Sequence, residues 1–335
     1  MNKILITGTA GFIGFHLANL LLGEGFNVHG YDGMTDYYDT NLKKDRHKIL
    51  HKYTNFDSTL GMLEDDKKLS TLTSSFQPDV IIHLAAQAGV RYSLENPRAY
   101  IDSNIVGTFN VLEVAKKEKI KHLLIASTSS VYGSNEKMPF TEKEKTDTQL
   151  TLYAATKKAN ENMAHSYSHL WKIPTTAFRF FTVYGPWGRP DMALFKFVSS
   201  ILKDQPIDVY NNGEMFRDFT YVDDLVCSIK LLINKSPTDS SNKISNKDSI
   251  SNIAPFRLIN IGNSNTVNLM DFIKTIEEIL GKKALYNYMP MQKGDVKATW
   301  ADSSLLKELT DYRPQTDIKS GIKKFIEWYL DYYKV

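Results

Sequence analysis

The fold is decided near the N-terminus by the stretch Lys3-Ile4-Leu5-Ile6-Thr7-Gly8-Thr9-Ala10-Gly11-Phe12-Ile13-Gly14. Residues 3–7 form an apolar run of strand length, residues 8–14 carry glycine at every third position, and a helical pattern follows at once. Glycines let a backbone approach a pyrophosphate, and a helix N-terminus offers free N–H groups. The order of strand, glycine loop and helix therefore predicts a dinucleotide-binding unit at the start of a parallel sheet.

The next predicted strand, residues 27–31, ends on a carboxylate. Asp32 stands where an acidic side chain would accept hydrogen bonds from the adenosine ribose hydroxyls. Its negative charge would repel a 2′-phosphate, so the sequence favours NAD over NADP. The glycine spacing is G-x-x-G-x-x-G rather than the G-x-G-x-x-G of many dehydrogenases. Residues 33–60 carry no pattern that assigns a structure, and in them Lys43 either reaches the cofactor or, as we expect, is a solvated lysine.

Further buried strands are predicted at residues 79–84, 121–126 and 174–181. The first ends on the small residues of Ala85-Ala86-Gln87, against which a flat ligand can pack. The second is followed by four hydroxyl residues, Ser127 to Ser130, at the end of the sheet where open α/β proteins bind ligands. Hydroxyls can hydrogen-bond a sugar without adding charge, although a serine-rich turn without a ligand is the simpler alternative. His83 is expected to be a hydrogen-bonded core residue.

Tyr153 and Lys157 lie four residues apart in a predicted helix, so both side chains leave the same face. A free tyrosine has a pKa of about 10, and a nearby ammonium favours the phenolate. The pair is therefore a candidate for proton chemistry, against the alternative of two residues that share a solvated face by accident. Residues 100–119 form another predicted helix that contains the polar Asn104, and Asp223 is a plausible N-cap of a later helix.

Composition limits the remaining possibilities. The chain has 335 residues, 42% of them hydrophobic, and a net charge of +3, so we expect neither a nucleic-acid surface nor a membrane span. Cys227 is the single cysteine, which excludes an internal disulfide and a multi-cysteine metal site. The start of the sequence does not resemble a signal peptide. We therefore expect a soluble cytoplasmic protein without a metal.

Taken together, these motifs resemble the extended short-chain dehydrogenases/reductases that act on nucleotide sugars. The resemblance rests on the glycine loop, on residues 83–86, on residues 127–133, on Tyr153-x-x-x-Lys157 and on residues 179–186. Within that family, residues 85–93 and 187–193 look most like UDP-glucuronate 4-epimerases. The resemblance implies an α/β fold, with a Rossmann-type doubly wound parallel sheet and a smaller α/β C-terminal domain that binds the UDP-sugar. It also implies an isomerase of polysaccharide biosynthesis that oxidises C4 transiently with bound NAD.

Roles for individual residues follow from the same resemblance. Tyr153 is the expected acid/base, Lys157 holds the nicotinamide ribose and lowers the tyrosine pKa, and Thr128 bridges Tyr153 to the sugar O4. The residues expected to line the cofactor are Gly8, Gly11, Phe12, Ile13, Gly14, Asp32, Leu84, Ala85, Ala86, Gln87, Asn104, Ser127, Tyr153 and Lys157.

A 4-keto glucuronate is a β-keto acid that can lose CO2, so an epimerase must hold the carboxylate still. Arg189 is the strongest candidate donor for it, because it is the charged one. Related decarboxylases carry a glutamate where Ser130 stands, and related 4,6-dehydratases carry Asp-Glu at Ser129-Ser130. The residues expected to bind substrate are Arg91, Thr128, Ser129, Ser130, Tyr153, Thr182, Arg189, Phe195, Tyr210 and Arg217.

The expected domains are residues 1–181 for NAD and 182–335 mainly for the UDP-sugar, with a return to the first domain at about 219–262. Residues 235–252 look like a flexible surface insertion. By resemblance, helices at about 100–118 and 153–170 form a homodimer interface.

Two departures from the family concern its ligand contacts. Residues 61–63 lack the aspartate that meets adenine in many relatives, and Gln292 stands near where UDP-galactose epimerases carry an arginine. The alternatives are a UDP-N-acetylglucosamine or UDP-glucose 4-epimerase and, from another class, a non-catalytic NAD-binding regulatory protein.

Overall fold

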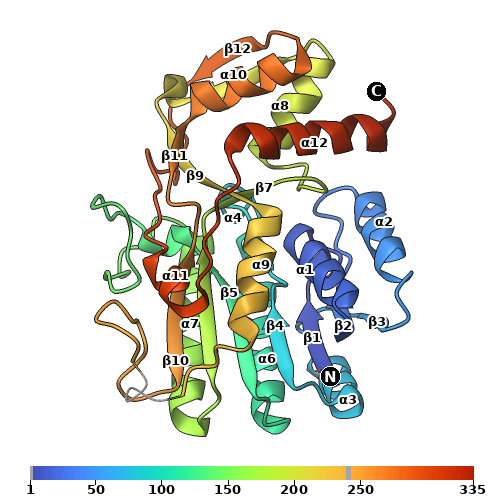
Figure 1. The fold of residues 1–335 in the computed structure, drawn as a ribbon, viewed down its shortest axis with the longest axis vertical. Coiled ribbons are helices and arrows are strands. Elements are labelled where there is room, and N and C mark those ends of the chain that lie inside the picture. Colours follow the sequence, from blue (N-terminus) through green and yellow to red (C-terminus); the bar gives the residue numbers. More distant parts are fainter. Residues whose placement is uncertain (1–2, 239–242) are drawn as a thin grey trace.

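The protein consists of two lobes of unequal size, as the computed structural model of residues 3–238 and 243–335 shows (Figure 1). The larger lobe contains a seven-stranded sheet in the order β10-β6-β5-β4-β1-β2-β3. All neighbouring strands in this sheet run parallel. The strands are β1 (Lys3–Thr7), β2 (Asn27–Asp32), β3 (Phe56–Leu60), β4 (Val80–His83), β5 (His122–Thr128), β6 (Thr175–Phe180) and β10 (Phe256–Ile261).

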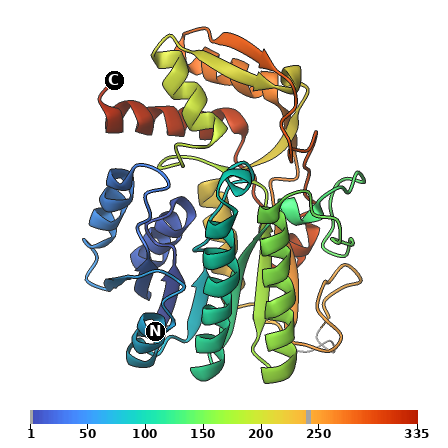
Figure 2. The ribbon, with the colours of Figure 1, turned by 180° about the vertical axis from the view of Figure 1, so that it is seen from behind.

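Helices cover both faces of this sheet (Figures 1 and 2). One face carries α1 (Phe12–Gly23), α9 (Val222–Ile233) and α11 (Ser304–Thr310), and the other carries α3 (Asp66–Phe76), α6 (Gly107–Lys117) and α7 (Leu152–Trp171). Successive residues of β1 serve the two faces, since Ile4 and Ile6 join the core under α1 and α9 while Leu5 joins the core under α3 and α6. A strand buried on both faces needs a continuous apolar run, which explains the sequence of residues 3–7. The predicted Rossmann-type doubly wound sheet is confirmed.

The smaller lobe is assembled from the later part of the chain. Its strands are β7 (Thr182–Tyr184), β9 (Phe216–Tyr221) and β11 (Thr266–Asn268) in one sheet and β8 (Pro206–Tyr210) with β12 (Leu285–Met289) in another. Its helices are α8 (Ala193–Leu202), α10 (Leu269–Leu280) and α12 (Ile318–Tyr333). The rings of Phe219 and Phe272 stack 4.3 Å apart in its core. The chain returns to the larger lobe with α9 and β10, so that lobe contains segments from both sides of residue 182, and the boundaries of the two domains stay a prediction.

Shorter elements connect these parts. They are α2 (Thr40–Leu50), α4 (Tyr92–Glu95), α5 (Pro97–Tyr100), the π-helical turn η1 (Ile101–Val106) and the 3-10 turns η2 (Ser129–Tyr132) and η3 (Asn211–Gly213). The helix predicted at residues 100–119 is present, but it begins with the π-helical turn. Residues 33–60, for which the sequence predicted no structure, contain α2 and β3.

Two details of the sequence prediction are wrong. Asp223 is not the N-cap of α9, because the capping position falls on Tyr221 and Asp223 lies in the first turn, 3.6 Å from the His16 ring nitrogen. The predicted flexible insertion is not entirely a surface segment. Residues 239–242 lie outside the described part of the chain, but Asp248 is buried and accepts hydrogen bonds of 3.0 and 3.2 Å from Arg257. This buried ion pair anchors the following residues to β10.

Among the described residues, no helix is both long enough and apolar enough to cross a membrane. The same residues contain no cluster of three or more His, Cys, Asp or Glu side chains suited to a metal ion.

Candidate active site

The glycine loop lies between the end of β1, the end of β4 and the start of α1. Gly8 has a φ of +87°, and a Cβ atom on it would lie 2.8 Å from the backbone nitrogen of Ala85, so only glycine fits there. The Gly8 N–H donates to the Tyr31 carbonyl at 2.7 Å, which ties the loop to β2. Helix α1 starts at Phe12 without a side-chain cap, so its first N–H groups remain free of side-chain acceptors. The backbone shape therefore fits a pyrophosphate at this helix N-terminus.

Asp32 lies at the end of β2, as predicted, and is nearly buried. One carboxylate oxygen accepts from the Ala10 N–H at 2.8 Å, and the other accepts from the Met34 N–H at 2.8 Å. Asp32 thus stabilises the glycine loop in addition to any contact with a ligand. Each carboxylate oxygen can accept a further hydrogen bond, so a ribose can still be bound. Its contact with the ribose stays a prediction.

Asn104 clamps the segment that follows β4. Its amide oxygen accepts from the Gln87 N–H at 2.8 Å, while its amide nitrogen donates to the Gln87 carbonyl and to the Thr156 hydroxyl, both at 3.0 Å. The π-helical turn brings this side chain into the sheet edge from the helix that starts at residue 101. Leu84, Ala85 and Ala86, in front of Gln87, are partly exposed, as a ligand-facing segment requires.

His83 is a neutral core residue, which confirms the prediction. Its ring nitrogens bond the hydroxyls of Thr7 and Thr108 at 2.8 and 3.0 Å. Burial lowers the pKa of His83 to about 3, with a smaller contribution from the charge of Lys157.

Tyr153 and Lys157 lie on the first two turns of α7, where Thr151 caps the helix by accepting from the Ala154 N–H at 3.3 Å. Lys157 is 3% exposed, and burial lowers its pKa to about 8, against the opposing effect of Glu161. Burial raises the pKa of the Tyr153 phenol, while a hydrogen bond with Thr128 and the charge of Arg189 lower it. Thr128 thus contacts Tyr153, as the family resemblance implied, and its bridge to the sugar stays a prediction. The lowering of the tyrosine pKa by Lys157 stays a prediction.

A buried ion pair lies directly behind this pair of residues. The Arg179 guanidinium donates to both carboxylate oxygens of Glu161 at 2.9 Å, and the Ser127 hydroxyl donates to Glu161 at 2.6 Å. Glu161 follows Lys157 by four residues on α7, so its carboxylate lies on the same side of the helix. We did not identify Glu161 from the sequence, although its spacing from Lys157 was the available signal.

The hydroxyl residues after β5 are held in a 3-10 turn. The Thr128 hydroxyl accepts from the Ser130 N–H at 3.2 Å and donates to the Ser130 hydroxyl at 3.3 Å. Ser129 is the first residue of the same turn, η2. Thr182 opens β7 and lines a small cavity together with Arg189 and Phe12, where the two lobes meet. The structure therefore brings residues from the glycine loop, β7 and the 185–192 segment to one place.

Arg189 is not a free cation. Its Nε and one terminal nitrogen donate to the two carboxylate oxygens of Asp191 at 3.0 and 2.5 Å. The Tyr37 hydroxyl donates to the same carboxylate at 3.2 Å, and the Arg189 guanidinium lies 5.9 Å from the centre of the Tyr37 ring. Burial, with the Asp191 charge, raises the pKa of Tyr37 to about 12. Asp191 and Tyr37 were not among the predicted site residues.

Phe195, one of the residues expected to bind substrate, lies mainly in the core of the smaller lobe. The side chain is 8% exposed and packs edge-on against Phe325, Tyr329 and Tyr333 in the core of the smaller lobe. Phe195 lines the small cavity, but most of its surface packs against α12, so its contact with the substrate stays a prediction. The apolar period of α8 explains this burial, and it could have predicted from the sequence that Phe195 faces the core.

The other predicted contacts for UDP form a polar group. The Arg91 guanidinium lies 4.5 Å from the centre of the Tyr210 ring and 3.4 Å from the Asp295 carboxylate. Arg217 donates to the carbonyl groups of Phe216 and Lys297 at 2.9 and 3.2 Å. Burial lowers the pKa of Arg217, and the charges of Asp295 and Arg91 act on it in opposite directions. The two arginines therefore lie near one carboxylate, in an arrangement suited to a diphosphate.

Most of the buried contacts made by residues of α2 were not predicted from the sequence. Lys43 is buried and donates to the Thr35 hydroxyl at 3.1 Å, so the expectation of a solvated lysine is wrong. Burial lowers the pKa of Lys43, and the charge of Asp32 opposes this effect. His47 bonds the Thr9 hydroxyl at 3.0 Å, and Arg46 contacts the backbone of the glycine loop. The buried side chains of α2 therefore support the glycine loop.

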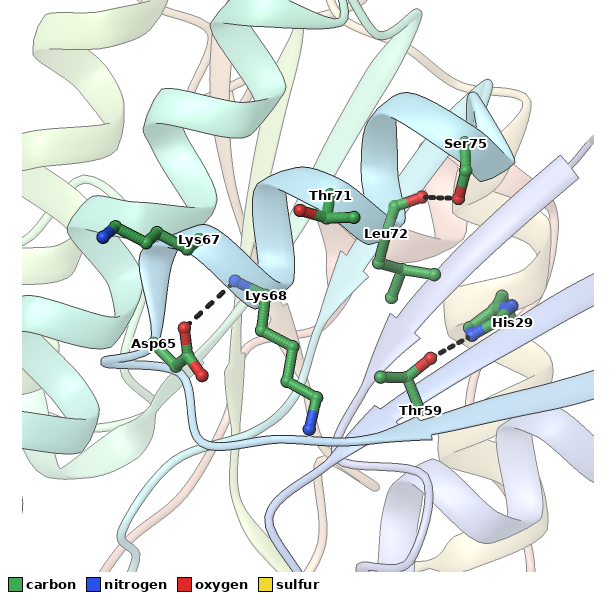
Figure 3. A pocket seen from close by; sticks show the side chains of 8 residues that line it. All are labelled: His29, Thr59, Asp65, Lys67, Lys68, Thr71, Leu72 and Ser75. Atoms are coloured by element: carbon green, nitrogen blue, oxygen red, sulfur yellow. Dashed lines mark hydrogen bonds between the residues drawn. The ribbon is translucent and has the colours of Figure 1, made fainter.

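A separate open groove lies between α3 and the strands β2 and β3 (Figure 3). His29 bonds Thr59 at 2.9 Å on one wall, and Asp65 accepts from the Lys68 N–H at 3.0 Å on the other. None of the predicted site residues lines this groove.

Comparison with known proteins agrees with this geometry. The model of a family described as "GDP-mannose 4,6 dehydratase" matches residues 5–325. A "Probable UDP-glucuronate 4-epimerase" of Rhizobium meliloti (strain 1021) is 54% identical over 99% of this chain and 98% of its own length, and "Protein CapI" of Staphylococcus aureus is 54% identical over 99% of both. The crystal structure of UDP-glucuronic acid 4-epimerase from Bacillus cereus in complex with UDP-glucuronic acid and NAD superimposes with a TM-score of 0.88 at 32% identity, covering 99% of this chain and 100% of the other.

Proposed function

The chain belongs to the family of the GDP-mannose 4,6 dehydratase model, and from that premise we propose that it is an NAD-dependent UDP-glucuronate 4-epimerase, which interconverts UDP-glucuronate and UDP-galacturonate. The observation that best supports this function is the set of residues at the end of β5. There Ser129 and Ser130 follow Thr128, and no carboxylate stands in the turn. The dehydratases that give the family model its name need acidic groups at these positions to move protons, whereas an epimerase needs none.

The residues of the glycine loop fit a dinucleotide. Gly8 leaves room for a backbone approach that any side chain would block, and the uncapped start of α1 faces the same place. NAD would be held there by the N–H groups of Phe12 and Ile13, with Asp32 at the adenosine ribose, while the Gly11 N–H donates to the Gly8 carbonyl at 3.0 Å. When bound, it supplies reversible oxidation at C4 of the sugar.

The proton chemistry is assigned to α7 and β5. Tyr153 removes the proton from the 4-hydroxyl and later returns it, and Thr128 hydrogen-bonds the phenol and the sugar oxygen. The buried ammonium of Lys157 holds the nicotinamide ribose and favours the phenolate over the phenol. Glu161 keeps Lys157 charged in spite of burial, since its carboxylate raises the pKa of the lysine. Because oxidation and reduction occur within one catalytic cycle, no net redox change results.

The substrate carboxylate is assigned to Ser129, Ser130, Thr182 and Arg189. Hydroxyl donors and a guanidinium can hold this carboxylate near the plane of the C4 carbonyl, where CO2 loss is slow. Asp191 already orients the guanidinium of Arg189 through two hydrogen bonds. The diphosphate is assigned to Arg91 and Arg217. Following the same assignment, residues 1–181 with the return at 219–262 bind NAD, and the remaining residues of 182–335 mainly bind the UDP-sugar.

A homodimer is part of the proposal. Large apolar side chains remain exposed on neighbouring helices of one face: Ile101 (37%), Val106 (39%), Phe109 (46%), Leu170 (60%) and Trp171 (45%). Figure 2 shows α6 and α7 side by side on that face without a covering element. Burying this surface between two copies would remove it from water. We further propose a cytoplasmic location and a role in polysaccharide biosynthesis, in line with the single cysteine and with the family resemblance.

The proposed function is tested by incubating the purified protein with UDP-glucuronate, UDP-glucose and UDP-N-acetylglucosamine, each with NAD+, and resolving the products by NMR. We expect UDP-galacturonate from the first sugar and slow or no conversion of the other two. Faster conversion of a neutral sugar would reassign the substrate. Binding of NAD+ without conversion of any sugar would point to a regulatory NAD-binding protein instead.

A further inference from the structure

The most unusual charge in the larger lobe is the Arg46 guanidinium of α2. Its side chain is 0% exposed. One terminal nitrogen donates to the Ala10 carbonyl at 2.7 Å and to the Tyr38 hydroxyl at 2.8 Å, and the other donates to the Trp187 carbonyl at 2.6 Å. Its Nε has no hydrogen-bond partner in the described part of the chain. The oxygens that Arg46 contacts are therefore neutral.

Two other buried arginines are neutralised by carboxylates. Arg179 pairs with Glu161, and Arg257 pairs with Asp248. Within residues 3–238 and 243–335, no carboxylate forms an ion pair with Arg46. A buried cation without an anion is costly, so a protein retains one where a ligand supplies the opposite charge.

A second cation adds to this excess of positive charge. Lys43 lies one turn before Arg46 on the buried side of α2, and burial and the charge of Arg46 both lower the pKa of Lys43. The charges of Asp32, whose oxygens already accept from two backbone N–H groups, and of the exposed Asp36 oppose this lowering. Lys43 and Arg46 are thus two buried cations beside the glycine loop, with Asp32 as the buried carboxylate near them.

Arg46 also sets the direction of a peptide group in the loop. Ala10 is held from both sides, because its N–H donates to Asp32 and its carbonyl accepts from Arg46. The carbonyl oxygen is thereby turned toward α2 and away from the free N–H groups at the start of α1. A carbonyl oxygen next to those N–H groups would repel a phosphate. Because the Ala10 carbonyl is turned toward α2, the start of α1 is better suited to bind an anion.

The second contact of Arg46 reaches the segment that carries Arg189. The Trp187 ring packs against Phe15 of α1 at 5.5 Å and against Tyr332 of α12 at 5.0 Å. One guanidinium thus connects the loop for the cofactor with the segment assigned to the sugar carboxylate.

We propose that Arg46 is a positioning residue for the dinucleotide, whose pyrophosphate supplies the anion that this buried cation lacks, and that the same guanidinium holds the 185–189 segment against the glycine loop. The inference rests on the assignment of NAD to this loop. The pyrophosphate need not touch Arg46, since a charge acts through a thin layer of buried backbone with little screening.

The test compares a charged ligand with an uncharged fragment of it. NAD+ affinity is measured by calorimetry and adenosine affinity by NMR titration, on the full-length protein freed of nucleotide. The variants are Arg46→Met, Arg46→Gln, which keeps an amide donor, and Arg46→Lys, which keeps the charge. Lys48→Met is the matched control, because it removes the same charge from the exposed side of α2. Circular dichroism and melting temperature identify variants that do not fold.

We expect Arg46→Met and Arg46→Gln to weaken NAD+ binding by at least 30-fold and adenosine binding by less than threefold. Arg46→Lys should recover most of the NAD+ affinity, and Lys48→Met should change neither ligand by more than twofold. Equal losses for NAD+ and adenosine, or an Arg46→Lys variant as weak as Arg46→Gln, would overturn the inference. Absence of NAD+ binding by the wild-type protein would instead refute the cofactor assignment itself.

Discussion

The Asp191 carboxylate accepts two hydrogen bonds from the Arg189 guanidinium, at 3.0 and 2.5 Å. The cation assigned to the sugar carboxylate is thus held in a fixed orientation by a residue two positions away. A guanidinium has five N–H groups, and the two that bond Asp191 leave others for a ligand. An acidic sugar would therefore enter an ion pair and convert it into a three-membered charge network.

The first prediction concerns this pair. Arg189→Ala leaves the substrate carboxylate without its cation and close to an unpaired Asp191, a loss of about 2 to 5 kcal/mol for a desolvated pair. Turnover of UDP-glucuronate should fall by roughly 30-fold or more, at 1.4 kcal/mol per tenfold. Turnover of a neutral UDP-sugar should change much less, and some UDP-glucuronate turnovers should end in CO2 release. Steady-state kinetics on both sugars give the ratio of the two losses.

The double variant Arg189→Ala/Asp191→Asn is the control for this experiment. It removes the repulsion by Asp191, so part of the activity toward UDP-glucuronate should return. Equal losses on acidic and neutral sugars would remove Arg189 from the carboxylate site.

The second prediction is that Tyr153→Phe abolishes turnover while NAD stays bound, because the change removes the proton carrier and almost no packing volume. Product formation is followed by NMR and bound cofactor by release on denaturation. Tyr167→Phe is the control, since it makes the same change farther along α7, where the hydroxyl contacts Glu113. Normal turnover by the Tyr153→Phe variant would end the proposed mechanism.

The third prediction uses the low pKa of Lys157. Its pKa is about 8 in the folded protein, against 10.5 for an unperturbed lysine. Below pH 8 both the folded and the unfolded state are protonated, so the full cost of burying the ammonium is present, at about 3 kcal/mol for this shift. Lys157→Met should therefore increase the free energy of unfolding at pH 7 by up to about that amount, while abolishing turnover.

This gain should shrink as the pH rises from 8 toward 10.5, because the unfolded wild-type chain then binds more protons than the folded one and wild-type stability rises. Urea unfolding of the nucleotide-free protein at pH 7 and at pH 10 measures the difference. A gain that is the same at both values would show that packing, rather than charge burial, is responsible.

The fourth prediction concerns the exposed apolar face on α6 and α7. The wild-type protein should be a dimer by light scattering at micromolar concentration, and Phe109→Glu should make it monomeric, because a carboxylate would be buried at the interface. Leu285→Glu is the matched control: Leu285 is 58% exposed, on β12 of the smaller lobe, and its replacement should leave the dimer intact. A monomeric wild-type protein contradicts the proposed interface.

Much of the fold was predictable because its signals are local. Each of three structures can be predicted from a few neighbouring residues: the strand from the apolar run of residues 3–7, the loop from the glycines that follow it, and the helix from the apolar period after Tyr153. The position of the four hydroxyl residues at the end of β5 followed from the same reasoning, because parallel strands present their carboxyl ends at one edge.

The supporting residues could not be predicted in this way, because their partners are distant in the chain. Arg46 appears in the sequence as one more polar residue of a charged helix, and only contacts with residues 10 and 187 show that it is buried. Glu161 likewise depends on Arg179 in a later strand. The burial of Phe195 could have been predicted, because its place in the helical period of α8 favours the core.

One contact across the molecule bears on the order in which a newly made chain acquires its ligand site. The Tyr332 hydroxyl donates to the Asp45 carboxylate at 2.6 Å, across 287 positions of the sequence, beside the guanidinium that braces the glycine loop. During translation, the first strands and α1 emerge and fold early, as N-terminal units generally do. Asp45 of α2 cannot accept this hydrogen bond until residue 332 has left the ribosome. The nascent chain therefore lacks this contact with α2 until residue 332 has been made.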